Sequence, residues 1–244
     1  MDASLFPALV RPVEHGRLER LRTRKFNPNS PYDLPPREAF TPHEREIIQT
    51  CRTPRQVQNF IRTFTYNRER NGETLRSFRV TLRHTTSHCL EAAFVAAAIL
   101  EQHGYPPLLL DLESKDKLDH VVFAFRQRGR WGSVGQSRDY SLQGRKPLYR
   151  TLRHLVMSYV DPFVTEEARI VGYALADLRE LVATDWRFSL KNVWSVEEAL
   201  IALPHIRLKT SDRRYVKVLR RYRAFKERFP QRQITFYPNR HQWM

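Results

Sequence analysis

Between residues 89 and 100, only Glu91 interrupts an apolar run that is rich in alanine. A helix that is apolar on every side is expected to be buried, so this stretch predicts the central helix of the fold. Gly104, Pro106 and Pro107 predict its end, because glycine is favoured just after a helix and proline cannot continue one. The polar residues 85–88 predict the loop that leads into the helix.

Three short apolar segments follow the central helix, at residues 108–112, 120–125 and 130–134. Apolar runs of this length between turn residues are typical of strands, and the turn at 127–129 makes the last two a hairpin. The sequence therefore predicts one buried helix followed by a small antiparallel meander, which is an α+β arrangement.

Helices are predicted on both sides of this unit. Upstream, Thr41 and Thr53 are N-cap candidates, each followed by a proline at the first helical position, whereas residues 74–84 have no clear period. Downstream, apolar residues at helical spacing predict four helices, and a capping box from Ser195 to Glu198 marks the start of the third. The four ranges are 148–159, 166–182, 195–203 and 212–229.

Composition divides the chain into three predicted parts. Residues 1–43 contain seven prolines and form a basic N-terminal arm, because proline resists both helix and sheet. Residues 44–146 hold the central helix and the meander, and are predicted to form the core. Residues 147–244 are predicted to be a helical C-terminal extension that ends in a basic amphipathic helix.

The net charge of +16 is concentrated near the ends of the chain. Residues 205–244 alone carry 12 Lys or Arg against 2 Asp or Glu. Such a surface favours nucleic acid, a ribonucleoprotein, an acidic protein or an anionic membrane surface as a partner, although a solvated charged face has the same pattern. The candidate contacts on the last helix are Arg213, Arg214, Lys217, Arg220 and Arg221.

Cysteine usage and the first residues predict a compartment. Cys51 and Cys89 are too few for a disulfide framework, and the N-terminus lacks the basic and apolar regions of a signal peptide. No apolar run reaches the 18 residues of a membrane span. We therefore expect a cytoplasmic protein with reduced thiols. Neither a zinc-type spacing nor a Gly-rich phosphate loop is present, so no metal and no cofactor is predicted.

Cys89 is the candidate nucleophile, because it stands at the first turn of the central helix. The unpaired N–H groups and the macrodipole of a helix start both stabilise a thiolate, although free cysteines are often buried and inert. A cysteine nucleophile needs a base, and His120 at the start of a predicted strand is the candidate. His88 could also touch the thiol, but a solvated loop histidine is the simpler interpretation.

These residues resemble those of a known family. Residues 87–93 (SHCLEAA) are similar to the pattern G-x-C-x-[DE]-x-A, in which a cysteine opens a helix. Residues 119–122 (DHVV) resemble the segment in which the family histidine opens a strand, and Trp131 follows in the next strand. The order resembles that of the transglutaminase-like superfamily over about residues 55–140, in particular its bacterial members. The resemblance implies a papain-like core, in which the Cys-bearing helix packs on a small antiparallel sheet.

The family orients its histidine with an aspartate at the place where this chain has Gly135. Asp139 is the nearest following carboxylate and is the first candidate to replace it. Ser137 and Gln136 are the alternatives, since either could hold a neutral imidazole by a hydrogen bond but would stabilise an imidazolium less than a carboxylate does. The predicted catalytic set is therefore Cys89, His120 and one of these three residues.

Two hypotheses about function follow. In the first, Cys89 attacks a carboxamide or peptide carbonyl of a protein or peptide substrate, His120 moves the proton, and a thioester passes to water or to an amine. The chain is then a cysteine hydrolase or acyltransferase. In the second, the fold serves as a non-catalytic or weakly catalytic interaction module, and its basic ends bind nucleic acid, a ribonucleoprotein or an acidic protein.

Overall fold

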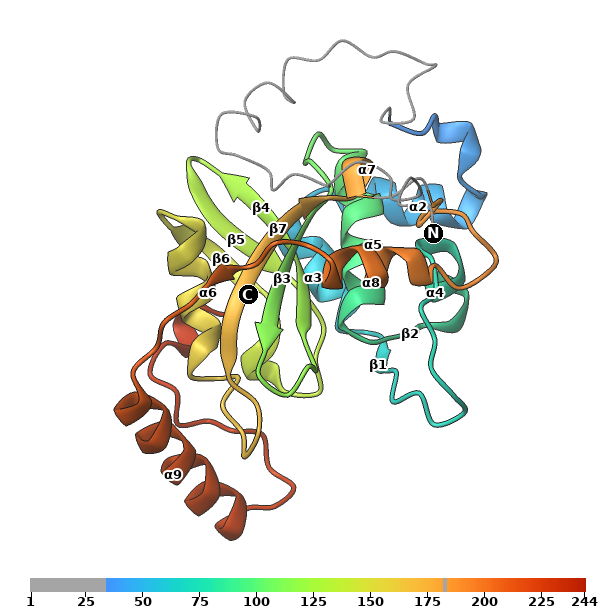
Figure 1. Ribbon diagram of the computed structural model, residues 1–244. Helices are drawn as coiled ribbons and strands as arrows, with labels where there is room; N and C mark the ends of the chain where they lie inside the picture. The colour runs from blue at the N-terminus through green and yellow to red at the C-terminus, as the bar shows by residue number, and fades with distance from the viewer. Residues whose placement is uncertain (1–33, 182–183) are drawn as a thin grey trace, which may run out of the picture.

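A six-stranded sheet forms the centre of the molecule in the computed structural model, which describes residues 34–181 and 184–244 (Figure 1). Every pair of neighbouring strands in it is antiparallel. Helices pack on the sheet, so the predicted α+β class is confirmed. In order across the sheet, the strands are β6 (Arg145–Tyr149), β5 (Arg130–Val134), β4 (His120–Gln127), β3 (Leu108–Ser114), β7 (Ile170–Asp177) and β8 (Ile206–Arg207).

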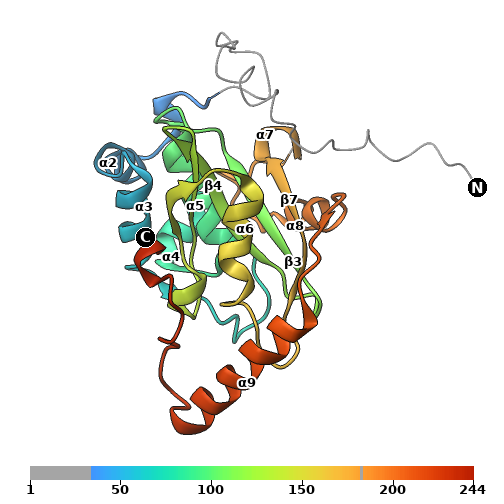
Figure 2. The ribbon, with the colours of Figure 1, turned by 90° about the vertical axis from the view of Figure 1, so that its left-hand side faces the viewer.

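Helices cover both faces of this sheet (Figure 2). On one face lies α5 (Cys89–Glu101), against which α3 (Pro54–Ile61) and α4 (Phe78–His84) pack, and on the other lies α6 (Leu152–Val160). The remaining elements are α2 (Pro42–Thr50), α7 (Leu178–Leu181), α8 (Trp194–Ile201), α9 (Asp212–Arg228), the 3-10 helices η1 (Arg37–Ala39), η2 (Tyr140–Leu142) and η3 (Arg240–Gln242), and a small parallel pair of β1 (Thr65–Tyr66) and β2 (Thr86–Ser87).

The alternation of side chains along β4 separates two hydrophobic cores. Val121 and Phe123 belong to the core shared with α5, whereas Val122 and Ala124 belong to the core shared with α6. Successive strand residues point to opposite faces, so one strand serves both layers. Burial of each large apolar side chain contributes about 1.5–3 kcal/mol, and His120, at the first position of β4, is therefore mounted on a strand fixed from both sides.

The predicted central helix is confirmed. Every residue of α5 after Cys89 is buried, and Gly104 beyond its end has a φ of +82°, a conformation that glycine adopts without strain. Thr41 and Thr53 cap α2 and α3 as predicted, each accepting a hydrogen bond from a backbone N–H of the first turn. The predicted meander is confirmed as β3, β4 and β5.

The helix predicted at residues 166–182 was wrong, since β7 occupies the middle of this range and only the short helix α7 follows it. β7 pairs with β3 along its whole length and with β8 on its other side. The ladder that β3 offers outweighs the weak helical preference of the alanines in this segment. The boundary predicted at residue 146 falls inside β6, and the sheet continues beyond it through β7 and β8.

One helix was not predicted and one local prediction fails. Residues 74–84, which have no clear period, contain α4. The capping box predicted at Ser195 does not form, because α8 already begins at Trp194 and the Ser195 hydroxyl pairs with that of Thr184. Most of the predicted N-terminal arm, residues 1–33, lies outside the described residues, while Phe40 at its end is buried in the core.

The last helix, α9, matches its predicted range closely and lies at the lower end of the molecule in both views (Figures 1 and 2). Its apolar stripe packs in a small separate cluster that includes Val164, Ile234 and Tyr237. Its charged face is exposed. In the described part of the chain, no helix is long and apolar enough to cross a membrane.

Candidate active site

Cys89 is the first residue of α5 and is partly exposed, whereas every other residue of the helix is buried. The first N–H groups of a helix have no acceptor within the helix, and they carry the positive end of the macrodipole. The thiol therefore lies where a thiolate is stabilised.

His88 caps this helix. Its Nε2 donates to the Thr74 carbonyl at 3.0 Å, and its Nδ1 lies 3.3 Å from the Leu90 nitrogen. Burial disfavours the charged ring, but hydrogen bonding to Cys89 and the charge of its thiolate, then that of Glu91, raise the pKa of His88 to about 9. A protonated Nδ1 cannot also accept from Leu90. Because the Leu90 contact is long and a thiolate is a charge-assisted acceptor, we assign the charged ring at neutral pH.

Glu91 holds the loop before Cys89 in place. It is fully buried and forms two hydrogen bonds with the Arg76 guanidinium, at 2.7 and 2.8 Å. It also accepts the backbone N–H groups of Arg76 at 3.0 Å and His88 at 3.2 Å, and the Thr74 hydroxyl at 3.1 Å. Burial disfavours the carboxylate, but hydrogen bonding to Arg76 and the charge of His88 keep the pKa of Glu91 below its usual value.

His120 opens β4, as predicted, and a backbone group orients its ring. Its Nε2 lies 2.8 Å from the Leu142 carbonyl oxygen. A carbonyl can only accept, so Nε2 carries the hydrogen, and Nδ1 is the nitrogen left for the thiol. The ring also packs beside Tyr159 and Phe163, with centroids 6.1 and 6.4 Å away.

The two histidines act on the Cys89 thiol together. Burial disfavours its thiolate, but hydrogen bonding from His120 and from His88, followed by the charge of each ring, lowers the pKa of Cys89 to about 5. An ordinary cysteine has a pKa of about 8.5. The lowered pKa favours the thiolate of Cys89, which is the nucleophilic form. The structure brings together Cys89 and His120 and adds His88 to them.

None of the three side chains predicted to orient His120 does so among the described residues. The Gln136 amide donates to two backbone carbonyls, that of the last residue of α3 and that of Phe64, and the Ser137 hydroxyl accepts the Asp139 N–H at 3.2 Å. Asp139 precedes η2, and the charge of its carboxylate acts on tyrosines of α9 and the C-terminal segment. The Leu142 carbonyl orients His120, which is the role that the sequence predicted for Asp139.

The surroundings of Gly135 explain why no aspartate stands there. A Cβ at this position would lie 2.7 Å from Cγ1 of Val122, which is packed in the core beneath α6. The Gln58 side chain also binds the backbone of Gly135 from both sides, accepting its N–H and donating to its carbonyl, each at 3.0 Å. An aspartate at this position would have to displace Val122. The His120 imidazole is oriented by a backbone carbonyl instead.

Arg145 fixes the loop that carries the Leu142 carbonyl. It is completely buried and donates to the carbonyls on either side, those of Ser141 at 2.6 Å and Gln143 at 2.7 Å. Its guanidinium lies 3.9 Å from the centre of the Tyr159 ring, and the Tyr159 hydroxyl donates to the same Gln143 carbonyl at 2.9 Å. Arg145 therefore positions His120 through the loop without touching the imidazole.

Sequence reasoning did not find these supports. A backbone carbonyl leaves no residue signature, and Arg145 resembles any other arginine of a basic chain. His88 had a signal, since it directly precedes the helix, as an N-cap does. In the described part of the chain, no group of three or more metal-ligating side chains is close enough to hold a metal ion.

No family model and no curated protein matches the chain. Among solved structures, it is similar to LapG of Legionella pneumophila, with a TM-score of 0.33 and 11% identity over 70% of this chain and 91% of that one. The EGTA-treated form of LapG gives a TM-score of 0.35 and 12% identity, over 78% of this chain and 98% of that one. A likeness at this level assigns no residue role and no activity.

Proposed function

We propose that this chain is a cysteine enzyme that hydrolyses an amide or peptide bond, or transfers its acyl group, through a thioester on Cys89. The observation that carries the proposal is geometric: Cys89 opens the buried helix α5, and the Leu142 carbonyl holds Nε2 of His120 so that Nδ1 is left for the thiol. Burial opposes the thiolate, but the pKa of Cys89 is lowered, mainly by hydrogen bonding from His120, and this supports the proposal. The buried helix on an antiparallel sheet supports a papain-like or transglutaminase-like core. An active thiol must stay reduced, so we also propose a cytoplasmic compartment.

The proposed reaction balances with the groups at the site. The Cys89 sulfur attacks the carbonyl carbon, and the carbonyl electron pair moves to oxygen. The C–N bond breaks as His120 Nδ1 gives its proton to the leaving amine, which leaves a thioester and a neutral imidazole. Water or an amine then attacks the thioester, Nδ1 takes its proton, and the sulfur departs as the thiolate.

Two groups are candidates to stabilise the negative oxygen that forms. The Cys89 backbone N–H is free of an intrahelical acceptor because it opens the helix. The Tyr66 hydroxyl is the second. Burial, and then the charge of the Cys89 thiolate, raise the pKa of Tyr66 to about 12, so its hydroxyl keeps its proton and remains a donor.

The test is the rate of iodoacetamide alkylation of Cys89 against pH. We expect a midpoint near pH 5 for the native protein, and an upward shift of at least about one unit in His120→Ala, which removes the main cation. His154→Ala, which changes an exposed histidine of α6, is the control and should leave the profile unchanged. A midpoint near pH 8.5 in the native protein that stays the same in His120→Ala would refute the proposal.

A second measurement looks for the intermediate itself. The native protein is incubated with a pool of peptides from a digested proteome, and its intact mass is followed. Acylation that maps to Cys89, and that is absent from Cys89→Ala, supports a thioester route. Amine transfer and hydrolysis are then separated by adding a labelled primary amine and measuring whether the label enters the products.

The basic surface of α9 supports a second candidate function, the binding of nucleic acid, a ribonucleoprotein or an acidic protein. Of the five predicted contacts, Arg214 pairs with Asp161, and Arg221 lies 4.7 Å from the Phe236 ring. Arg213, Lys217 and Arg220 are exposed and make no ion pair with any described residue. Their spacing places them along one side of the helix.

Salt dependence tests this candidate. Binding of a short single-stranded RNA and of duplex DNA is measured at several salt concentrations for the native protein and for Arg213→Gln/Lys217→Gln/Arg220→Gln. A phosphate-binding surface predicts weaker binding as salt rises, and a shallower salt slope in the triple variant. Equal slopes for the two proteins would remove α9 from any such role.

A further inference from the structure

A cavity of about 500 Å³ lies between the segment that follows α3, the loop 136–143 and the C-terminal residues. Four arginines line it, Arg62, Arg68, Arg138 and Arg240, together with aromatic and amide side chains. We call it the arginine cavity. The proposed mechanism uses none of these four side chains.

Two lining residues connect the arginine cavity to the proposed active site. Tyr66 pairs in the β1–β2 sheet with Ser87, two residues before Cys89, and the charge of the Cys89 thiolate acts on its hydroxyl. Gln143 directly follows Leu142, whose carbonyl holds His120. A molecule bound in this cavity would therefore lie beside the bond that Cys89 attacks.

The charges of the cavity are unbalanced. No Asp or Glu lines it, and in the described part of the chain none of its four arginines forms an ion pair. Arg62 donates to Gln143 Oε1 at 2.9 Å, and Arg138 lies 5.8 Å from the centre of the Tyr66 ring. By contrast, eight other arginines of this part of the chain are paired with carboxylates. Arg62 also donates to the Met244 main-chain oxygen, so the guanidinium groups available to an anion are those of Arg68, Arg138 and Arg240.

We propose that the arginine cavity is the subsite that recognises an Asp or Glu side chain of a peptide substrate, next to the amide that Cys89 attacks. The inference rests on the proposed function. Guanidinium groups bind carboxylates through paired N–H donors, and the aromatic walls can bury the aliphatic part of a glutamate. A cavity of this size takes one or two side chains, whereas a nucleic acid needs a longer groove.

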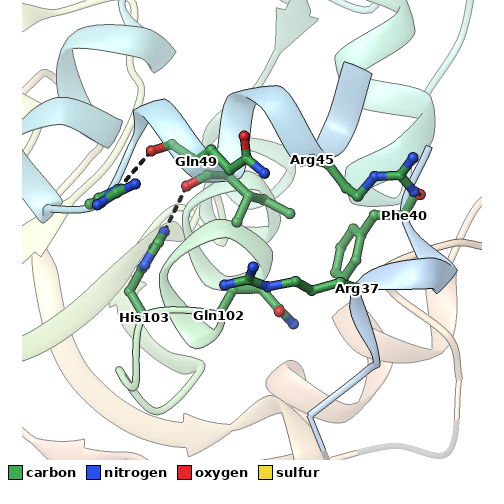
Figure 3. A pocket seen from close by; sticks show the side chains of 8 residues that line it. Arg37, Phe40, Arg45, Gln49, Gln102 and His103 are labelled. Carbon is green, nitrogen blue, oxygen red and sulfur yellow. Dashed lines mark hydrogen bonds between the residues drawn. The ribbon is translucent and has the colours of Figure 1, made fainter. Parts of the chain in front are cut away.

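A second cavity provides the control. It has a volume of about 280 Å³ and lies at the opposite end of α5, where Gln102 and His103 line it (Figure 3). Arg37 and Arg45 also line it, so it is basic as well, but it is distant from Cys89. Arg37→Gln therefore removes a cavity arginine without touching the proposed site.

The first experiment uses Cys89 as its own reporter. The rates of alkylation by iodoacetate, an anion, and iodoacetamide, which is neutral, are measured for the native protein, Arg68→Gln/Arg138→Gln and Arg37→Gln. The ratio of the two rates cancels the thiolate fraction, because both reagents attack the same sulfur. We expect the ratio to fall about fivefold or more in the double variant at low salt, and to stay at the native value in Arg37→Gln. Equal ratios in all three proteins would overturn the inference.

The second experiment tests the substrate class. Cys89→Ser protein is titrated with hexapeptide amides in which one Glu is stepped through an alanine background, and with the matching Gln set. Glu-dependent binding that is lost after Arg68→Gln/Arg138→Gln supports the acidic subsite. Equal affinity for the Glu and Gln sets contradicts it. So does a single-stranded oligonucleotide that binds more tightly than every Glu peptide and needs the same two arginines.

The two experiments separate this inference from the proposed function. If iodoacetate is preferred and Glu peptides bind but no acyl-enzyme forms, the acidic subsite stands and the enzyme proposal fails. If an acyl-enzyme forms equally from acidic and neutral peptides, the enzyme proposal stands and the acidic subsite fails.

Discussion

Two buried arginines hold the two sides of the proposed active site, and they do so by different means. On the cysteine side, Arg76 is paired with the Glu91 carboxylate, which also accepts the N–H of the helix cap. On the histidine side, Arg145 has no carboxylate partner among the described residues and donates to backbone carbonyls. Burial lowers the pKa of Arg145, as expected for a cation without a nearby anion.

The difference concerns where charge is needed. The cysteine side carries an ion pair beside the helix start, and the charge of its Glu91 carboxylate acts on His88. On the histidine side the cation holds the carbonyls of Ser141 and Gln143, and Leu142, which lies between these two residues, orients His120 through its own carbonyl. We therefore expect the cysteine side to dominate folding stability, and the histidine side to dominate the alignment of the imidazole.

The largest expected effect is that of Glu91→Gln. The change keeps the shape of the side chain but leaves the Arg76 cation buried without its partner, which costs about 3–5 kcal/mol in the free energy of unfolding. Urea denaturation followed by circular dichroism measures it. Glu166→Gln is the control, because Glu166 pairs with Arg223 on the exposed surface, and it should cause no measurable loss.

The same variant has a pH dependence of known sign. Folding lowers the pKa of Glu91, so its contribution is present above the unfolded pKa, about 4.3, and is lost as the pH falls through the folded value. Native protein and Glu91→Gln should therefore converge in stability in acid. A constant difference between them across pH 3–7 would mean that the carboxylate charge is not what holds Arg76.

The second effect is that of Arg145→Met on the histidine side. The carbonyls of Ser141 and Gln143 lose their donor, which destabilises the fold, but removal of a buried cation without an anion offsets part of this cost. We therefore expect the free energy of unfolding to fall by about 1–3 kcal/mol, less than in Glu91→Gln. The sharper readout is the thiol. If Arg145 positions His120, the pKa of Cys89 measured by alkylation is higher in Arg145→Met than in the native protein. In Arg145→Lys it should lie between these two values. Lower stability with an unchanged thiol pKa would make Arg145 a purely structural residue.

The same comparison marks the limit of sequence reasoning. The cysteine side is local in sequence, and the apolar run, the helix start and the position of Cys89 were all visible as patterns. The histidine side joins β4, β5, the loop 141–144 and α6, and its key group is a backbone carbonyl. No spacing rule relates residue 142 to residue 120, so the sequence pointed to side chains such as Asp139 instead.

The fold divides in the same way. The meander β3–β5 was predictable because each strand is a short apolar run between turns. β7 was not predictable in this way. Its residues form a strand because they pair with the edge of β3, which lies more than fifty residues earlier in the chain. Tertiary pairing of this kind overrides local preference.

A third prediction concerns Gly135, where steric fit excludes an aspartate. Gly135→Ala should destabilise the protein by about 1–3 kcal/mol, because the new Cβ meets Val122. In a Val122→Ala background the clash is removed, and Gly135→Ala should cost less than it does alone. Double-variant analysis of unfolding free energies measures this coupling. Simple additivity of the two changes would mean that Val122 does not exclude a side chain there.

The smallest effect, on His88, decides whether the cysteine side supplies charge to the thiol or only a cap. Asparagine is a good N-cap residue, so His88→Asn keeps the cap but removes the second imidazole. The pKa of Cys89 should rise, but less than in His120→Ala, because His120 contributes more to the lowered value. The measurement is the rate of alkylation of Cys89 against pH, compared between His88→Asn and His120→Ala. An unchanged profile would leave His88 as a neutral cap with Nδ1 on the Leu90 N–H, and would assign the low thiol pKa to the histidine side alone.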